Sequence, residues 1–194
     1  MLFRSGTVYS LNPGADLFTN GYRYLNWMIV VPMLLIQILF VAEITGSDRT
    51  RYMTRFTIAG CLMILFGYIG QFYEPGRLNE NVFLWAFWGI ISTLAFIYVL
   101  VLITRVIRQG REHMEGTPRN IFGAILPLFY ISWWLYPIAY AAPVFMNMGV
   151  SYELTIVSQQ LIYTIADIAS KVIYGVMLAV TASMLSERQG FQMA

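Results

Sequence analysis

The segment Thr164-Ile-Ala-Asp-Ile-Ala-Ser-Lys171 holds the only lysine of the chain, with Asp167 four residues before it. On a helix, side chains four residues apart share one face and lie one turn from each other. Both residues stand near the middle of an apolar run from about Leu154 to Leu185, too far from either end for the lysine to reach water. Ionisable groups at the centre of a membrane helix are costly and mark functional sites. The segment therefore predicts a membrane helix and a site within it.

The composition is typical of a polytopic membrane protein. Hydrophobic residues make up 58% of the 194 residues, charged residues make up 11%, and the mean hydropathy is +0.63. Soluble domains carry about 25% charged residues. The formal net charge of +2 is too small to indicate nucleic acid as a partner, so membrane lipid is the expected surrounding. With one cysteine (Cys61) and one histidine (His113), the sequence has neither a disulfide pair nor a metal-ligand spacing, and no metal centre is expected.

Five apolar runs are each long enough to cross a bilayer, which takes about 20 residues of helix. They cover roughly residues 21–43, 55–73, 82–105, 120–146 and 154–185. The expected fold is therefore all-α, a polytopic membrane bundle of five transmembrane helices. Residues 1–19 are predicted to be a polar extracellular lead-in, residues 20–186 the transmembrane domain, and residues 187–194 a cytoplasmic tail.

The distribution of arginine predicts the orientation, because cytoplasmic loops of membrane proteins carry an excess of Lys and Arg. Arginines on one side of a five-span bundle are Arg49, Arg51, Arg55, Arg105, Arg108, Arg111, Arg119 and Arg188; the other side has Arg4, Arg77 and, at the membrane edge, Arg23. We therefore expect a multi-pass protein of the inner (plasma) membrane, with its N-terminus outside and its C-terminus in the cytoplasm.

The lysine and aspartate have two interpretations. A structural ion pair is the first, but a buried pair adds little net stability because desolvation of both ions offsets their attraction. The second is chemical: an amine withdrawn from water loses its proton more readily and then condenses with carbonyl compounds to form a Schiff base. Asp167 is placed to be the counterion once that base is protonated. Tyr136 is a candidate to hydrogen-bond this carboxylate.

Other polar and aromatic residues of the spans fit around this pair. Four tryptophans on other spans are candidates to wall a slot for a long, flat, apolar aldehyde: Trp27, Trp88, Trp133 and Trp134. Gln160 and Thr164, on the last span, are expected to form hydrogen bonds between helices.

Three motifs resemble the third, sixth and seventh helices of microbial rhodopsins. They are Arg23-Tyr-Leu-Asn-Trp27 with Pro32, Trp133-Trp-Leu-Tyr-Pro137, and Asp167-Ile-Ala-Ser-Lys171. The segments 12–27 and 67–74 are similar to the light-driven sodium-pumping branch in particular. The resemblance implies that the five spans correspond to helices three to seven of the seven-helix rhodopsin fold, with helices one and two absent. Either the sequence is a fragment or the protein is a shortened, five-helix form.

The resemblance also implies a cofactor and a set of site residues. All-trans-retinal would be bound to Lys171 as a protonated Schiff base, with Asp167 as counterion. The implied pocket residues are Trp27, Met63, Gly67, Gly89, Ser92, Trp133 and Tyr136. The implied ion path includes Arg23 as an extracellular gate, Asn26, Gln37 and Ser170. Asp16 matches a position at which the sodium pumps bind an ion at the interface of a homo-oligomer, a pentamer in that branch.

One departure from the branch bears on transport. Sodium pumps have Asn, Asp and Gln at three positions of the third helix, where this chain has Asn26, Val30 and Gln37. The aspartate that serves as main counterion and accepts a proton is thus a valine, and Asp167 is left as the nearby carboxylate. We therefore expect pumping of sodium or protons to be impaired. Chloride beside the Schiff base is another possibility of the family, although valine is a poor anion ligand.

Three functions follow as alternatives, none of them an enzyme. The first is a light-driven ion transporter of the sodium-pump type, and the second is a photosensory or degenerate rhodopsin that binds retinal without pumping. The third is a cofactor-free membrane scaffold in which Lys171 and Asp167 form a purely structural pair.

Overall fold

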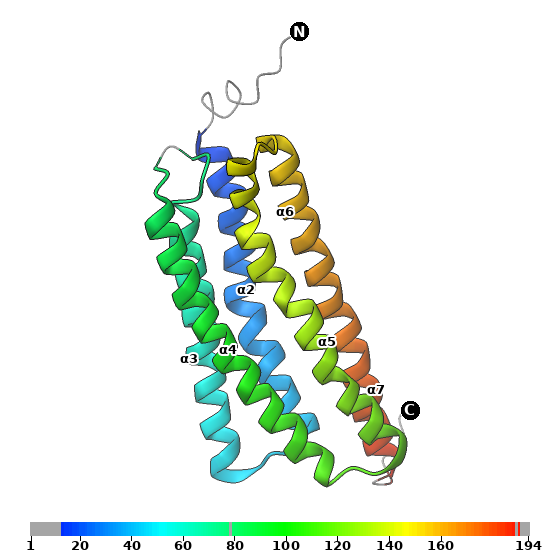
Figure 1. Cartoon of the computed structure of the whole chain (residues 1–194). Helices are drawn as coiled ribbons and strands as arrows, with labels where there is room; N and C mark the ends of the chain where they lie inside the picture. Colours follow the sequence, from blue (N-terminus) through cyan, green and yellow to red (C-terminus); the bar gives the residue numbers. More distant parts are fainter. Residues whose placement is uncertain (1–12, 78, 189, 191–194) are drawn as a thin grey trace.

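The computed structural model describes residues 13–77, 79–188 and 190, with side chains described from residue 21 onward except at Asn147. Over these residues the chain is helical and contains no strand (Figure 1). The elements are α2 (Pro13–Val41), α3 (Gly46–Gln71), α4 (Val82–Glu112), α5 (Gly116–Ala141), a 3₁₀ helix η1 (Ala142–Met148), α6 (Tyr152–Asp167), a π-helical segment η2 (Ile168–Ile173) and α7 (Tyr174–Arg188). The prediction of an all-α fold is confirmed.

Five helical segments in the described part of the chain are long and apolar enough to cross a membrane. They are Gly21–Val41, Gly46–Gln71, Val82–Glu112, Gly116–Met146 and Tyr152–Arg188. The last of them joins α6, η2 and α7 into one continuous rod. The five predicted spans are therefore present, in the predicted order.

Several helices extend further than the apolar runs predicted. α2 begins at Pro13, so part of the predicted lead-in is helical; proline suits the first turn of a helix because its φ is already helical. α3 begins at Gly46 and α4 continues to Glu112, so the arginines expected in loops lie largely on helical turns. Hydropathy marks where the hydrocarbon ends, whereas arginine is itself a good helix former. Residues 1–12 of the lead-in and 191–194 of the tail lie outside the described residues.

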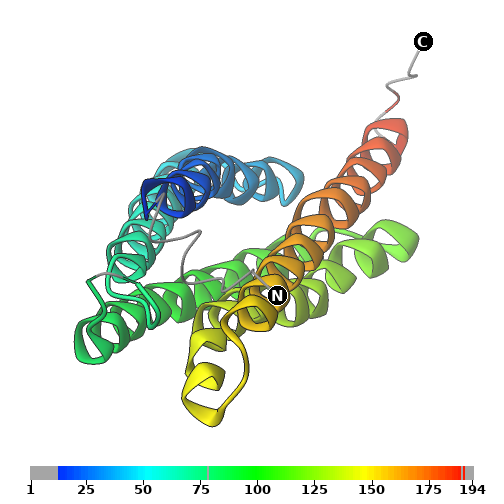
Figure 2. The same ribbon diagram turned by 90° about the horizontal axis from the view of Figure 1, so that it is seen from above.

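The helices pack mainly against their neighbours in the sequence. Viewed from above, they form an arc from α2 and α3 through α4 and α5 to α6 and α7 (Figure 2). α2 also contacts α4 and α7, which draws the two ends of the arc together. The hydroxyl of Tyr174 on α7 donates a hydrogen bond to the carbonyl of Leu34 on α2, 2.8 Å away.

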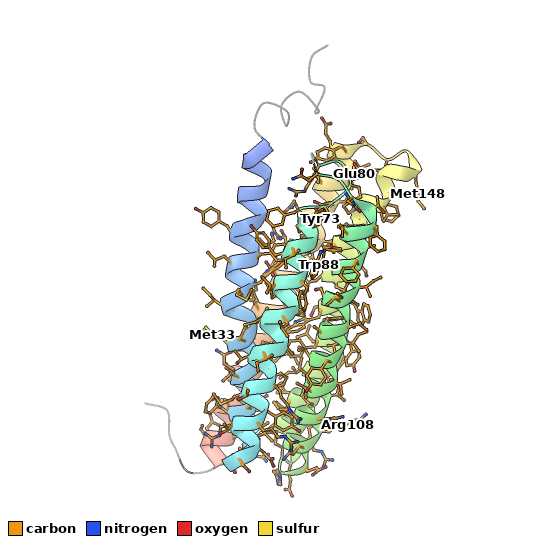
Figure 3. All side chains as sticks on the ribbon, turned by 90° about the vertical axis from the view of Figure 1, so that its left-hand side faces the viewer. Met33, Tyr73, Glu80, Trp88, Arg108 and Met148 are labelled. Carbon is orange, nitrogen blue, oxygen red and sulfur yellow. The ribbon has the colours of Figure 1, made fainter. Side chains whose placement is uncertain are left out.

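The two ends of the bundle differ in charge. The α2–α3 and α4–α5 connections lie at the same end as the last turn of α7 (Figure 1). Figure 3 shows Arg108 at this end and Glu80 and Met148 at the opposite one. We call the end that carries Arg108 the arginine-rich end. The half of the bundle next to this end is filled by fully buried side chains, namely Leu35, Ile38, Leu39, Leu102, Ile103, Ile107, Phe122, Ile125 and Phe129.

Candidate functional site

The helix around Lys171 is wider than an α-helix. Ile168–Ile173 adopts π-helical hydrogen bonding between α6 and α7, and Asp167 immediately precedes it. Such segments are rare and frequently occur at functional sites. Despite the wider turn, Lys171 Nζ lies 2.8 Å from Asp167 Oδ1, and the two side chains are 23% and 27% exposed. The ion pair predicted from the four-residue spacing is therefore present.

One oxygen of Asp167 accepts from three elements of the bundle. Besides Lys171, Oδ1 accepts from the indole Nε1 of Trp27 on α2, at 3.0 Å, and from the hydroxyl of Tyr136 on α5, at 2.6 Å. The predicted hydrogen bond from Tyr136 is thus confirmed, whereas the donation from Trp27 was not predicted. Hydrogen bonds to a charged group are stronger than neutral ones. The carboxylate is therefore held in one orientation toward the amine.

Ser170 extends this network by one step. Its Oγ lies 2.9 Å from the hydroxyl oxygen of Tyr136, and the serine is 2% exposed. Because the single hydroxyl hydrogen of Tyr136 is donated to Asp167, Ser170 must be the donor in this contact. The resulting chain of donors runs from Ser170 to Tyr136 to Asp167.

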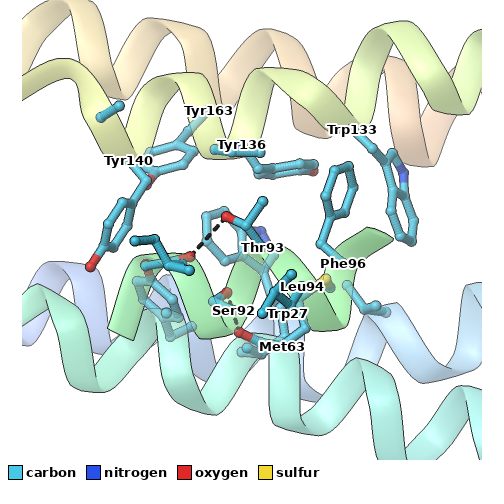
Figure 4. A pocket seen from close by; sticks show the side chains of 18 of the residues that line it. Trp27, Met63, Ser92, Thr93, Leu94, Phe96, Trp133, Tyr136, Tyr140 and Tyr163 are labelled. Atoms are coloured by element: carbon cyan, nitrogen blue, oxygen red, sulfur yellow. Dashed lines mark hydrogen bonds between the residues drawn. The ribbon is translucent and has the colours of Figure 1, made fainter. Parts of the chain in front are cut away.

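Next to this network lies a partly open cavity of about 370 Å³, lined largely by aromatic and small side chains (Figure 4). Small-molecule sites typically have cavities of about 300–1,000 Å³. The seven pocket residues implied by the resemblance all line it: Trp27, Met63, Gly67, Gly89, Ser92, Trp133 and Tyr136. Of the four tryptophans expected to wall a slot, Trp88 and Trp134 do not line the cavity, so that part of the prediction is wrong. Ser170 and Lys171 line it as well. The structure thus brings residues of α2, α3, α4, α5 and η2 together around one space.

The polar groups of the cavity wall are largely occupied by the protein itself. Ser92 Oγ donates to the carbonyl of Met63 at 2.7 Å, and Thr93 Oγ1 donates to the carbonyl of Gly89 at 2.8 Å (Figure 4). Apart from the network at Lys171, this wall therefore presents mainly carbon to a ligand.

Tyr140 is a wall residue that the sequence did not predict. Its ring stacks on Trp85, with centroids 5.4 Å apart, and its hydroxyl donates to the carbonyl of Trp85 at 2.9 Å. A Cβ atom built on Gly89 would lie 2.6 Å from Tyr140 Cε1, and one built on Gly70 would overlap the tyrosine hydroxyl. The two glycines therefore form a slot for this ring. Their positions on α3 and α4 are visible in the sequence, but the α5 side chain that fills the slot is not.

The residues predicted for an ion path are not gathered into one place. The Arg23 guanidinium lies over the rings of Trp27, at 5.9 Å, and Tyr163, at 5.2 Å. Asn26 and Gln37 are exposed on α2, while Ser170 belongs to the network at Asp167. Asp16 lies in the first turns of α2, and its side chain is outside the described residues.

A second ion pair, more deeply buried than Lys171–Asp167, was not predicted. Arg77 Nε lies 2.9 Å from Glu74 Oε2, and these side chains are 9% and 1% exposed. Gln159 on α6 donates to Glu74 Oε1 at 2.8 Å, and Gln71 donates to the same oxygen at 3.3 Å. Glu74 follows α3 in a polar stretch of the sequence, yet it is buried and contacts Gln159 of α6.

The expected role of Thr164 is also wrong. Its hydroxyl donates to the carbonyl of Gln160, one turn earlier on the same helix, and the residue is exposed. Threonine on a helix commonly satisfies its hydroxyl by donating to a carbonyl one turn earlier.

Comparisons with known proteins agree with this geometry. Residues 1–185 match the family model described as bacteriorhodopsin-like protein, and the chain belongs to this family of microbial rhodopsins. It is 23% identical over 163 residues to a bacteriorhodopsin-II-like protein of Haloquadratum walsbyi, which covers 84% of this chain and 61% of that protein. It is 24% identical to a green-light absorbing proteorhodopsin of Gamma-proteobacterium EBAC31A08, with 81% of this chain and 59% of the relative covered. The chain therefore spans about three fifths of the length of these relatives.

Two solved structures share the fold. Xanthorhodopsin, described as a light-driven ion pump with a dual chromophore, gives a TM-score of 0.76 at 29% identity, covering 92% of this chain and 68% of that one. The rhodopsin of Exiguobacterium sibiricum gives a TM-score of 0.73 at 27% identity, covering 85% and 71%. Rhodopsins of this family bind retinal, and relatives of the chain are light-driven pumps.

Proposed function

We propose that this membrane protein binds all-trans-retinal covalently through Lys171 and responds to light. The observation that carries the proposal is the position of the only lysine of the chain, which pairs with Asp167 and lines an apolar cavity. A bound retinal would supply the absorption of visible light and a change of shape on illumination. The site's own residues hold, orient and charge-balance the amine to which it is attached.

The cavity suits such a ligand in shape and chemistry. Retinal is a long, flat, apolar aldehyde, so its site needs one amine, one anion and otherwise a carbon-lined slot. Lys171 and Asp167 meet the first two needs. Gly67 and Gly89 add no side chain to the wall, and the hydroxyl of Ser92 donates to a backbone carbonyl.

Asp167 is the group that stabilises positive charge on the lysine nitrogen. Trp27 and Tyr136 donate to the same oxygen that faces Lys171, which fixes the position of the negative charge. Because Ser170 donates to Tyr136, a movement of η2 would be transmitted to the Asp167 carboxylate through two hydrogen bonds. Arg23 supplies a further positive charge beside Trp27.

The finer part of the proposal concerns transport. The motifs around Asn26 and Gln37 support membership of the sodium-pumping branch, with the five spans corresponding to helices three to seven, and with sodium or protons moved by a homo-oligomer. Val30 opposes full pumping, because it places hydrocarbon on α2 where those pumps carry a carboxylate. A photosensory rhodopsin that binds retinal without pumping is the second candidate, and Val30 is the residue that favours it.

Reconstitution with retinal tests the proposal. The protein mixed with all-trans-retinal should develop a visible absorption band, which Lys171→Ala should abolish. Lys171→Arg is the matched control: arginine retains a positive charge opposite Asp167 but cannot form the covalent link, so it should fold and also lack the band. Absence of a band from the unmodified protein, or its persistence in Lys171→Arg, would refute covalent retinal binding. In illuminated vesicles, a sodium-dependent current would then exclude the photosensory candidate.

A further inference from the structure

A second concave surface lies on the first turns of α3 at the arginine-rich end, away from the cavity. Its lining residues are Ser47, Thr50, Arg51, Thr54 and Arg55. Their spacing of three or four residues puts them on one side of the helix. Phe56, in contrast, is fully buried and marks the side that faces the bundle. We call this surface the α3 groove.

The α3 groove presents hydrogen-bond donors that the described part of the chain does not use. Neither Arg51 nor Arg55 has a hydrogen-bond acceptor or an acidic partner among the described residues, and the same holds for the side-chain hydroxyls of Ser47 and Thr50. Arg49, on the same helix, is engaged instead: its Nε donates to the carbonyl of Ile44 at 2.9 Å. The groove is thus a cluster of donors without an acceptor.

The length of α3 places the groove at the level of lipid headgroups. At a rise of about 1.5 Å per residue, a helix of this length is roughly 39 Å long, about 9 Å longer than the hydrocarbon core of a bilayer. The apolar part of the helix runs toward Gln71, so the excess length lies at the Gly46 end. Thr50, Arg51 and Thr54 are exposed there and face outward from the bundle.

We propose that the α3 groove binds the phosphate of an anionic phospholipid. Guanidinium groups match the oxygens of a phosphate through paired hydrogen bonds, and arginine is favoured over lysine for this recognition. The two arginines stand one helical turn apart, so both can reach one phosphate, and the two hydroxyls add donors beside them. Because the groove faces outward from the bundle at the depth expected for headgroups, a lipid is the occupant rather than a soluble anion. The inference does not depend on retinal.

Lipid binding can be counted by native mass spectrometry of the full chain in detergent. The probes are dioleoylphosphatidylglycerol and dioleoylphosphatidylcholine at equal concentrations. If each arginine that reaches the phosphate contributes about five-fold in affinity, Arg51→Gln with Arg55→Gln should lower the preference for the anionic lipid by roughly ten-fold or more. Arg51→Lys with Arg55→Lys keeps the positive charges but loses the planar guanidinium groups, so it should lower the preference for the anionic lipid by an intermediate amount.

Arg119→Gln is the matched control, because Arg119 is exposed at the same end but lies on α5, outside the groove. Because Arg119 does not line the groove, its substitution should lower the preference much less than the double change does. Equal binding of the two lipids by the unmodified protein would overturn the proposal. So would an equal loss in Arg119→Gln, which would indicate diffuse attraction, or displacement of the lipid by millimolar inorganic phosphate, which would indicate a soluble-anion site. Helical circular dichroism of each variant establishes that it is folded.

Discussion

The slot that holds Tyr140 predicts that Gly89→Ala has opposite effects on stability in the native protein and in a Tyr140→Ala variant. In the native protein, Gly89→Ala would place a methyl group 2.6 Å from Tyr140 Cε1. The ring cannot retreat, because its hydroxyl contacts Gly70 on the other side and its face stacks on Trp85. The substitution must therefore displace Tyr140 and strain its hydrogen bond to the Trp85 carbonyl.

The free energy of unfolding follows from these contacts. Overfilling a well-packed site costs about 1–3 kcal/mol, and loss of the hydrogen bond adds about 0.5–1.5 kcal/mol. Replacing glycine by alanine inside a helix returns about 0.5–1 kcal/mol. Gly89→Ala should therefore destabilise the native protein by about 0.5–4 kcal/mol. In a Tyr140→Ala background the collision is gone, so the same change should stabilise by about 0.5–1 kcal/mol.

Equilibrium unfolding in mixed micelles, followed by circular dichroism, measures all four proteins of this double-mutant cycle. A Cβ atom at Gly175 on α7 would contact nothing within 4 Å, which makes Gly175→Ala the matched control. It should stabilise both backgrounds by a similar small amount. Equal effects of Gly89→Ala in the two backgrounds would refute the slot, because a coupling energy near zero means that the two residues do not share space.

Three further substitutions test other parts of the structure. Glu74→Gln removes the anion of a buried pair and should lower the free energy of unfolding by about 3–5 kcal/mol in thermal unfolding. Glu80→Gln, on the exposed connection, should change this free energy by less than about 0.5 kcal/mol. Similar losses in the two variants would contradict the burial of Glu74. Tyr136→Phe deletes a donor to Asp167 and should cost about 1.5–3 kcal/mol as well as shift the retinal band, so an unshifted band argues against this contact. Val30→Asp should give illuminated vesicles a light-driven ion current larger than that of the native protein. No increase would show that Val30 is not what impairs transport.

The sequence predicted the bundle well because each span is a local property. About 20 apolar residues suffice to indicate a crossing, whatever the neighbours are. The pair Lys171–Asp167 was equally accessible, since a spacing of four residues places two side chains together on any helix. Tyr136 was predicted as a candidate donor to the carboxylate, and its 2.6 Å contact with Asp167 agrees.

The features that were missed depend on contacts between distant parts of the chain. Gln159 and Glu74 are 85 residues apart, so their hydrogen bond cannot be read from either segment. The π-helical turn at Ile168–Ile173 contains neither glycine nor proline and leaves no mark in the local sequence. The ends of the helices were missed for a different reason: a hydropathy pattern detects the hydrocarbon layer, while α3 and α4 continue beyond it.

The central claim, a retinal linked to Lys171, is tested most directly by locating the attachment. The retinal-loaded protein is treated with borohydride to fix the linkage, digested, and examined by mass spectrometry. Because Lys171 is the only lysine, the N-terminal amine is the only other primary amine of the chain and serves as the internal comparison. The proposed function predicts a retinyl mass on the peptide that contains Asp167 and Lys171. An unmodified peptide together with a visible absorption band would contradict it.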